Sequence, residues 1–172
     1  MQKEFSYPLI IADLPLSEQH YKMRADDNVK PFLSQVLQVK AVKMFDADFW
    51  IKPDRSTSIL QINGHIKTEL VLQSVVSLEE FTKSYDFDFT TSFDTKATLN
   101  SQKEDGDDWD TDTPEIVVDG KIDLGDVAIE QVALRLDYYP RQEGEEFYFK
   151  SEFDDDETVG NHPFAALKKL KK

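Results

Sequence analysis

Apolar and polar residues alternate along three segments in the middle of the chain. In residues 60–72, 39–51 and 84–94, most second positions carry an apolar or aromatic side chain. These positions are Leu60, Ile62, Ile66, Leu70 and Leu72, then Val39, Ala41, Phe45, Ala47, Phe49 and Ile51 with Lys43 as the exception, and Tyr85, Phe87, Phe89 and Phe93. A period of two is typical of strands with one buried face, whereas strands of a parallel sheet are usually covered on both faces. The pattern therefore predicts long antiparallel strands.

Helical spacing of apolar residues occurs on both sides of these strands in the sequence. A first helix is predicted up to Leu37, with Pro31 in its first turn, where a missing N–H is tolerated. A second helix is predicted over about 124–136, with Asp126 near its positive end. The expected N-caps are Asp27 or Asn28 for the first helix and Asp123 for the second. Residues 163–170 form a last, short amphipathic segment.

Two segments of the chain are strongly acidic. Residues 101–114 contain six carboxylates and are predicted to form a flexible loop, and residues 143–157 contain eight, with Lys150 as their only base. The expected fold class is α+β, with an antiparallel sheet of long strands packed by two or three helices. The chain is expected to form one domain over residues 1–160, followed by a short amphipathic basic tail over residues 161–172.

Charge narrows the kinds of partner that the chain can bind. The 172 residues include 34 acidic and 20 basic side chains, a net charge of −14, which repels polyanions over most of the surface. Direct RNA contact is therefore expected only through the basic tail, which ends in Lys168, Lys169, Lys171 and Lys172. The tail is either a docking element or a frayed end whose lysines complement a helix terminus. The acidity likewise either attracts a basic partner or only confers solubility.

Motifs for catalysis or for binding a metal or cofactor are missing from the sequence. There is no cysteine, no glycine-rich phosphate loop and no GxSxG turn. His65 falls on the polar face of a predicted strand, while His20 and His162 fall in segments predicted to be irregular. The carboxylates that begin at Asp105 fail the EF-hand pattern because Asp110 stands where that loop needs glycine. We therefore expect no catalytic residue, no cofactor and no metal.

Targeting signals are also missing from the sequence. No stretch approaches the roughly 18 apolar residues of a membrane span. Residues 1–7 lack the basic region and long apolar run of a secretory signal peptide. A cytoplasmic protein without membrane association is expected.

Three further segments form an ordered combination. The first is residues 64–81, which ends in LQSVVSLEEF, and the second is residues 122–141, which contains IDL, EQ and LRLDYYPR. The third is PFAALKKLK at residues 163–171. In this order the segments resemble the YceD family, which is named for accumulation of the large-subunit ribosomal RNA. The first sixty residues resemble the family only in their general character and contain none of the three segments.

The resemblance implies a non-enzymatic factor that supports synthesis, processing or stability of large-subunit ribosomal RNA during ribosome assembly in a bacterial cytoplasm. The implied partner is a large-subunit precursor or a ribosomal protein, bound by a monomer. The residues expected to bind it are Phe164, Leu167, Lys168, Lys169 and Lys171 in the tail, and Arg135, Tyr139 and Arg141 near the end of the main helix.

This chain departs from the family pattern at one notable place. Many members carry Cys-x-x-Cys where Ser74 and Ser77 stand here, and often a further Cys or His after the segment that matches Pro140. Serine is a poor zinc ligand compared with a thiolate. Any metal role of those cysteines therefore does not carry over to this chain. At the C-terminal motif, His162 also separates Asn161 from the Pro-Phe pair.

Two other functions stay open at this stage. The first is an acidic escort for a basic protein, bound through the two acidic segments and therefore sensitive to salt. The second is a carboxylate-dependent metal enzyme that acts on phosphate esters, which would need several acids converging in one cleft.

Overall fold

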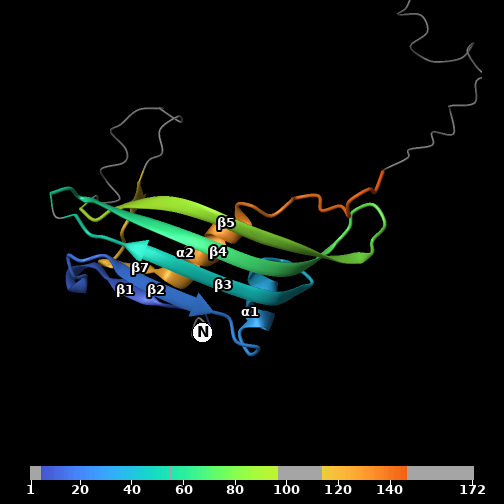
Figure 1. Cartoon of the computed structure of the whole chain (residues 1–172), viewed down its shortest axis with the longest axis horizontal. Coiled ribbons are helices and arrows are strands. Elements are labelled where there is room, and N and C mark those ends of the chain that lie inside the picture. The colour runs from blue at the N-terminus through green and yellow to red at the C-terminus, as the bar shows by residue number, and fades with distance from the viewer. Residues whose placement is uncertain (1–4, 55, 97–113, 147–172) are drawn as a thin grey trace, which may run out of the picture. The chain divides into compact units, whose positions relative to one another are not determined.

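The computed structural model describes residues 5–54, 56–96 and 114–146 of the chain (Figure 1). Its main sheet has five strands in the order β2-β3-β4-β5-β6. These strands are β2 (Gln19–Arg24), β3 (Ala41–Ile51), β4 (Ile59–Gln73), β5 (Glu80–Asp94) and β6 (Glu115–Ile116). A small second sheet pairs β1 (Pro8–Ile10) with β7 (Lys121–Asp123), a 3-10 turn covers Ile11–Asp13, and the helices are α1 (Lys30–Val36) and α2 (Leu124–Ala133). All strand pairs are antiparallel except β5 with β6, so the expected α+β class with a mostly antiparallel sheet is confirmed.

A bulge in β3 explains the exception in the alternating pattern. The register between β3 and β4 shifts between Val42 and Met44. A bulge adds one residue to one strand, so Lys43 falls outside the alternation. Val42 and Phe45 are then both buried although their positions differ in parity. Lys43, the polar residue that interrupts the alternation of apolar residues, is therefore the sign of this bulge in the sequence.

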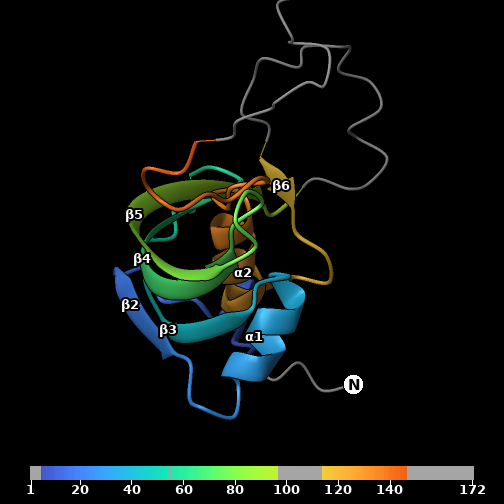
Figure 2. The same cartoon turned by 90° about the vertical axis from the view of Figure 1, so that its right-hand side faces the viewer.

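The main sheet curves around α2, which lies on its concave side (Figure 2). The helix contributes Leu124, Val127, Ala128 and Val132 to a core that also contains Phe45, Phe49, Ile62, Ile66 and Leu70 from the sheet. Full burial of each large apolar side chain contributes about 1.5–3 kcal/mol. The apolar faces predicted for the long strands and for the second helix thus pack against each other.

Close packing across the sheet requires a glycine at residue 64 of β4. Gly64 is paired with Phe49 of β3 on one side and with Phe89 of β5 on the other. The two phenyl rings meet edge to face, with centroids 6.0 Å apart. A Cβ atom on Gly64 would lie 2.3 Å from the ring of Phe89. This ring therefore fills the space that any side chain at residue 64 would need.

The start of α2 is held by the N-terminal segment. The carboxylate of Asp123 accepts hydrogen bonds from the N–H of Gly125 and from the N–H of Tyr7, both at 2.9 Å. The hydroxyl of Ser6 donates to the same carboxylate at 2.5 Å. The prediction of Asp123 as the N-cap is confirmed. The helix ends at Ala133, three residues before the predicted end, and continues as hydrogen-bonded turns.

The first helix begins later than the sequence predicted. Its N-cap is Val29, which makes no side-chain cap, so the expected cap at Asp27 or Asn28 is wrong. The backbone carbonyl of Asp26 accepts from the N–H groups of Val29 and Lys30, at 2.9 and 3.2 Å. The carboxylate of Asp27 instead pairs with the Lys30 ammonium at 2.7 Å. A backbone turn thus satisfies the first donors of α1 and leaves no role for a side-chain cap.

The short strands were not predicted from the sequence. Strands of two to six residues are too short for a visible alternation, and β2 also lies at the edge of the sheet, where its side chains are largely polar. One local signal was available before β7. Asp119 and Gly120, with φ values of 54° and 65°, form the turn between Val118 and Lys121. An Asp-Gly pair is typical of such two-residue hairpin turns.

Several predictions fall outside the described residues. These are most of the acidic loop over residues 101–114 and the amphipathic segment over residues 163–170. The described fold belongs to a compact unit, Met1–Gln142, and a second unit, Glu143–Lys172, is described only over residues 143–146, where Gly144 has a φ of 86°. The domain boundary expected at residue 160 stays a prediction. In the described part of the chain, neither helix is long and apolar enough to cross a membrane.

Glu115 of β6 gives the stability of the fold a small dependence on pH. Partial burial of its carboxylate, together with the negative charge of Glu130 on α2, raises the pKa of Glu115, and a hydrogen bond from Thr91 at 3.3 Å lowers it in part. The folded chain therefore binds this proton more tightly than the unfolded chain does. The resulting stabilisation is present at low pH and is lost as the pH rises through the raised pKa of the folded state.

We expect Glu115→Gln to raise the free energy of unfolding by a few tenths of a kcal/mol at pH 7, since the side chain is largely exposed. The gain should vanish at about pH 3.5, below the ordinary glutamate pKa of about 4.3. Urea unfolding at both pH values measures the difference, with Glu18→Gln as an exposed control. Equal gains at both pH values would contradict this account.

Candidate binding site

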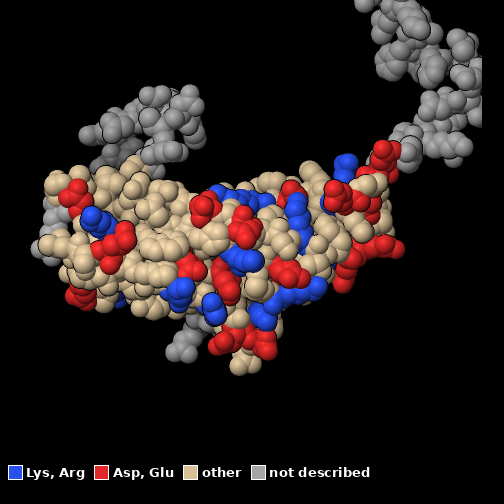
Figure 3. All heavy atoms as spheres, in the orientation of Figure 1, with Lys and Arg blue, Asp and Glu red and all other residues tan. Residues whose placement is uncertain are grey.

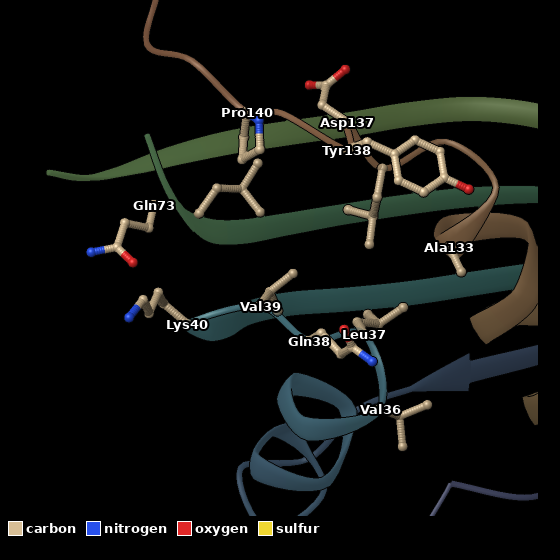
Figure 4. A pocket seen from close by; sticks show the side chains of 12 residues that line it. Val36, Leu37, Gln38, Val39, Lys40, Gln73, Ala133, Asp137, Tyr138 and Pro140 are labelled. Carbon is tan, nitrogen blue, oxygen red and sulfur yellow. The ribbon is translucent and has the colours of Figure 1, made fainter. Parts of the chain in front are cut away.

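A cleft of about 650 Å³ lies near the end of β4. Residues 36–40, from the end of α1 onward, line one side, and residues 136–140, which follow α2, contribute Leu136, Asp137, Tyr138 and Pro140 to the other. Figure 4 shows these two groups of side chains facing each other, with Gln73 at one end and Ala133 at the other. The cleft therefore joins three parts of the chain that are far apart in sequence.

Most of the residues that line the cleft are apolar, although polar atoms contribute about half of its exposed surface. Eight of the twelve lining residues are apolar or aromatic, namely Val36, Leu37, Val39, Leu72, Ala133, Leu136, Tyr138 and Pro140. Val36 is 45% exposed and Tyr138 is 94% exposed. Asp137 is paired with the ammonium of Lys83, and this hydrogen bond is the main reason why the pKa of Lys83 is raised. The cleft thus exposes apolar side chains beside polar groups and carries little net charge.

The turn after α1 shapes one wall. Gln38 has a φ of 55°, the left-handed conformation that often ends a helix. The N–H of Val39 donates to the carbonyl of Ser34 at 3.0 Å, and the N–H of Lys40 donates to the carbonyl of Val71 in β4 at 3.0 Å. These bonds attach the end of α1 to the sheet and set the position of this wall.

The opposite wall is fixed by contacts with β5 and with the turn between β4 and β5. The guanidinium of Arg135 lies over the ring of Phe87, 3.9 Å from its centroid. The carbonyl of Pro140 accepts a hydrogen bond from the N–H of Val75 at 2.9 Å. Cation–π contacts of this kind contribute about 0.5–2 kcal/mol. The segment after α2 is therefore held on the sheet, although it is neither helix nor strand.

The turn between β4 and β5 is organised by Ser74, which is 1% exposed. Its hydroxyl oxygen accepts from the N–H of Val76 at 3.0 Å and from the N–H of Ser77 at 3.3 Å. Its own N–H donates to the carbonyl of Glu79 at 2.9 Å. Buried backbone donors need such partners. A serine hydroxyl thus supports the backbone at residue 74, one of the two positions where the resemblance to the YceD family leads us to expect a cysteine.

The outer face of the sheet carries alternating charges. Two neighbouring rows across β2, β3, β4 and β5 are Lys22, Asp48, His65 and Asp88, and Arg24, Asp46, Lys67 and Asp86. Figure 3 shows basic and acidic side chains mixed on this face. Cross-strand pairs of opposite charge contribute roughly 0.2–1 kcal/mol each. This face is therefore a solvated surface with mutually compensating charges.

The structure corrects the placement of His20. This residue lies in β2, where its Nε2 is 2.9 Å from a carboxylate oxygen of Asp48 and its ring stacks on Trp50 with centroids 4.8 Å apart. His65 lies on the polar face of β4 as predicted, and its ring nitrogens are 3.2 and 2.8 Å from two carboxylates of β5. In the part of the chain that the structure describes, no three His, Asp or Glu side chains form a group that could hold a metal ion.

Three of the residues predicted to bind a partner are described. Arg135 is engaged with Phe87, while Tyr139 is 76% exposed and Arg141 is exposed. None of the three lines the cleft, although Tyr139 and Arg141 flank its Pro140. The other predicted residues, Phe164, Leu167, Lys168, Lys169 and Lys171, lie outside the described residues.

Sequence reasoning missed the residues that line the cleft itself. Val36 was assigned to the apolar face of the first helix, and Tyr138 was seen only as part of a motif. No signal in the sequence distinguishes Val36, because Phe32, Leu33 and Val36 have the spacing of an ordinary apolar helix face. Of these three residues Leu33 is buried, whereas Val36 is 45% exposed.

Comparison with known proteins gives one match. The family model described as Large ribosomal RNA subunit accumulation protein YceD matches residues 62–171. The chain belongs to the YceD family. No curated protein and no solved structure matches it. The resemblance seen in the sequence is thereby confirmed, including the segment in which Ser74 and Ser77 stand.

Two of the three segments that carry the YceD resemblance lie side by side in the structure. Residues 64–81 and 122–141 are joined by the hydrogen bond between Val75 and Pro140. Together they supply two parts of the cleft, the end of β4 and the wall after α2. The third part, residues 36–40, precedes the matched range.

Proposed function

We propose that this YceD-family protein supports accumulation of large-subunit ribosomal RNA by binding a component of the assembling subunit. One observation carries the proposal: segments that place the chain in the family come together around an open cleft that exposes the apolar side chains of Val36 and Tyr138. Apolar surface that stays exposed on a folded protein typically marks an interaction site. Binding is thus the activity that this arrangement favours.

Binding without catalysis is supported by the composition of the cleft. Among its lining residues Asp137 is the carboxylate, and its charge is paired with Lys83. General acid–base or metal chemistry needs several titratable groups that converge on a reacting atom. The same observation weighs against a metal-dependent hydrolase of phosphate esters.

The basic tail is proposed as a second contact. Its lysines stand in a chain with a net charge of −14, which confines favourable contact with RNA phosphates to such a segment. The protein is proposed to act as a monomer in the cytoplasm, and its partner is proposed to be a large-subunit precursor or a ribosomal protein.

Cells that lack the protein should contain less large-subunit RNA relative to small-subunit RNA, and the full chain should restore the ratio. The protein should also co-sediment with large-subunit precursors. Deletion of residues 163–172 should reduce the co-sedimenting fraction several-fold. An unchanged RNA ratio without the protein would overturn the proposed function, and unchanged co-sedimentation of the deletion variant would overturn the role of the tail.

A second candidate is an escort for a basic protein, favoured by the fourteen carboxylates in residues 101–114 and 143–157. Such a complex would form by charge attraction and would weaken steeply with ionic strength. Replacing the acidic residues of one segment by Gln and Asn would then abolish binding at low salt. A complex that persists at high salt would favour the cleft instead.

A further inference from the structure

Exposed apolar residues also lie on the turn that is bonded to one wall of the cleft. Val75 and Leu78, on the turn between β4 and β5, are 45% and 68% exposed. This turn is attached to the cleft wall because the N–H of Val75 is bonded to Pro140. Val36 and Tyr138 expose apolar surface on opposite sides of the cleft. The surface therefore suits a polypeptide segment that places several apolar side chains, rather than a compact polar molecule.

The charge of the cleft argues for a protein and against RNA. Its charged lining residues are Lys40 and Asp137, and Asp137 is paired with Lys83. RNA binding depends on clustered cations that face the phosphates. Such a cluster is missing from the lining of this cleft, which is formed wholly by described residues. Apolar side chains, in contrast, are stabilised when they are removed from water.

The charge of the whole chain selects among proteins. The net charge is −14, and residues 143–157, which begin three positions after Pro140 in the sequence, contain eight carboxylates. A negative field accelerates encounter with a positively charged partner and slows encounter with a negative one. The partner that fits both observations is a basic protein with exposed apolar residues.

We infer that the cleft binds a short segment of a basic protein, which inserts a few apolar side chains while its lysines or arginines remain outside. The inference rests on the proposed function, which makes large-subunit ribosomal proteins the partner class. The cleft volume of about 650 Å³ lies within the range that is usual for ligand-binding clefts in proteins. Val36 and Tyr138 are the residues expected to contact the inserted side chains.

The full chain is titrated against fluorescent 15-residue peptides that tile the large-subunit ribosomal proteins of the same organism. Peptides that contain apolar residues beside Lys or Arg should bind, and Val36→Glu and Tyr138→Glu should weaken binding at least tenfold. The matched controls are Val118→Glu and Leu16→Glu, which alter exposed residues that do not line the cleft. They should stay within twofold of the unaltered chain. Equal urea midpoints, and a parallel effect of the milder Tyr138→Ala, show that the loss is not unfolding.

The inference is overturned if no peptide binds, or if the control variants lose as much affinity as the cleft variants. It is also overturned if large-subunit RNA fragments bind the chain and lose affinity in the Val36→Glu and Tyr138→Glu variants, which would make RNA the occupant. Self-association of the unaltered chain that these two variants abolish would make a second copy the occupant, and would overturn the inference too. NMR signals of cleft residues that move when residues 147–172 are deleted would point to an internal occupant and overturn it as well. If the chain still co-sediments with large-subunit precursors in any of these cases, the proposed function survives, whereas loss of co-sedimentation by the unaltered chain removes the proposed function itself.

Discussion

Gly64→Val is expected to lower the free energy of unfolding by about 3 kcal/mol. Two effects of the substitution oppose each other. Valine has the higher strand propensity, which is worth at most about 1 kcal/mol. Against this, a Cβ at residue 64 would lie 2.3 Å from the ring of Phe89, and forcing extra groups into a packed core costs typically about 1–3 kcal/mol or more. Overpacking therefore outweighs propensity, and urea unfolding measures the difference.

A double variant separates overpacking from other causes. Phe89→Ala alone is expected to cost about 3–5 kcal/mol through lost burial and a cavity. In the double variant, the valine occupies part of the space that the ring leaves, so the combined cost should fall short of the sum by at least about 1 kcal/mol. Gln61→Val, an exposed residue of the same strand, controls for propensity. Additive costs would show that Phe89 is not the obstacle.

Ser74→Ala is expected to lower the free energy of unfolding by about 2 kcal/mol. The hydroxyl oxygen accepts hydrogen bonds from the N–H groups of Val76 and Ser77. Without it, these donors lose their acceptor in a turn where Ser74 is buried, and each unsatisfied buried donor costs about 1–3 kcal/mol. Because water reaches part of the turn, the cost for both donors together should stay near the lower end of the sum of two such penalties. The measurement is again equilibrium unfolding in urea.

Ser77→Ala is the matched control, because Ser77 is exposed and its hydroxyl accepts the long hydrogen bond from the N–H of Glu79, at 3.3 Å. Its cost should stay below about 1 kcal/mol. If the two variants are equally stable, the turn does not depend on the Ser74 hydroxyl.

The sequence predicted the long elements of the fold because their burial follows a simple period. Over Leu60–Leu72 every second residue is buried, and five of these seven are large apolar residues, so the segment was recognisable as the strand β4. The turn before α1 could not be predicted in the same way. Its first N–H groups are bonded to the backbone carbonyl of Asp26, and since every residue has such a carbonyl, the sequence carries no signal for it. Strand β2 was missed since an edge strand with polar side chains has no apolar period.

The candidate site was predictable only in part. The motif LRLDYYPR drew attention to the segment after α2, and Tyr138 within it does line the cleft. On the opposite wall, Val36 falls at helical spacing and Val39 on the apolar face of a predicted strand, and both patterns are typical of ordinary core residues. Which apolar residues stay exposed depends on how distant segments pack, and the order of residues along the chain does not contain that information.

The alternating charges on the sheet have a consequence for the electrostatics of the whole molecule. Residues 101–114 hold six acids and one base, and residues 143–157 hold eight acids and one base, so these two segments carry twelve of the fourteen excess negative charges. The remaining 143 residues are close to electroneutral, as the mixed rows of β2 to β5 illustrate. The isoelectric point and the electrophoretic mobility are therefore properties of two short segments. Substitutions in these two segments can therefore reset both properties while the described core residues that pack against α2 stay unaltered.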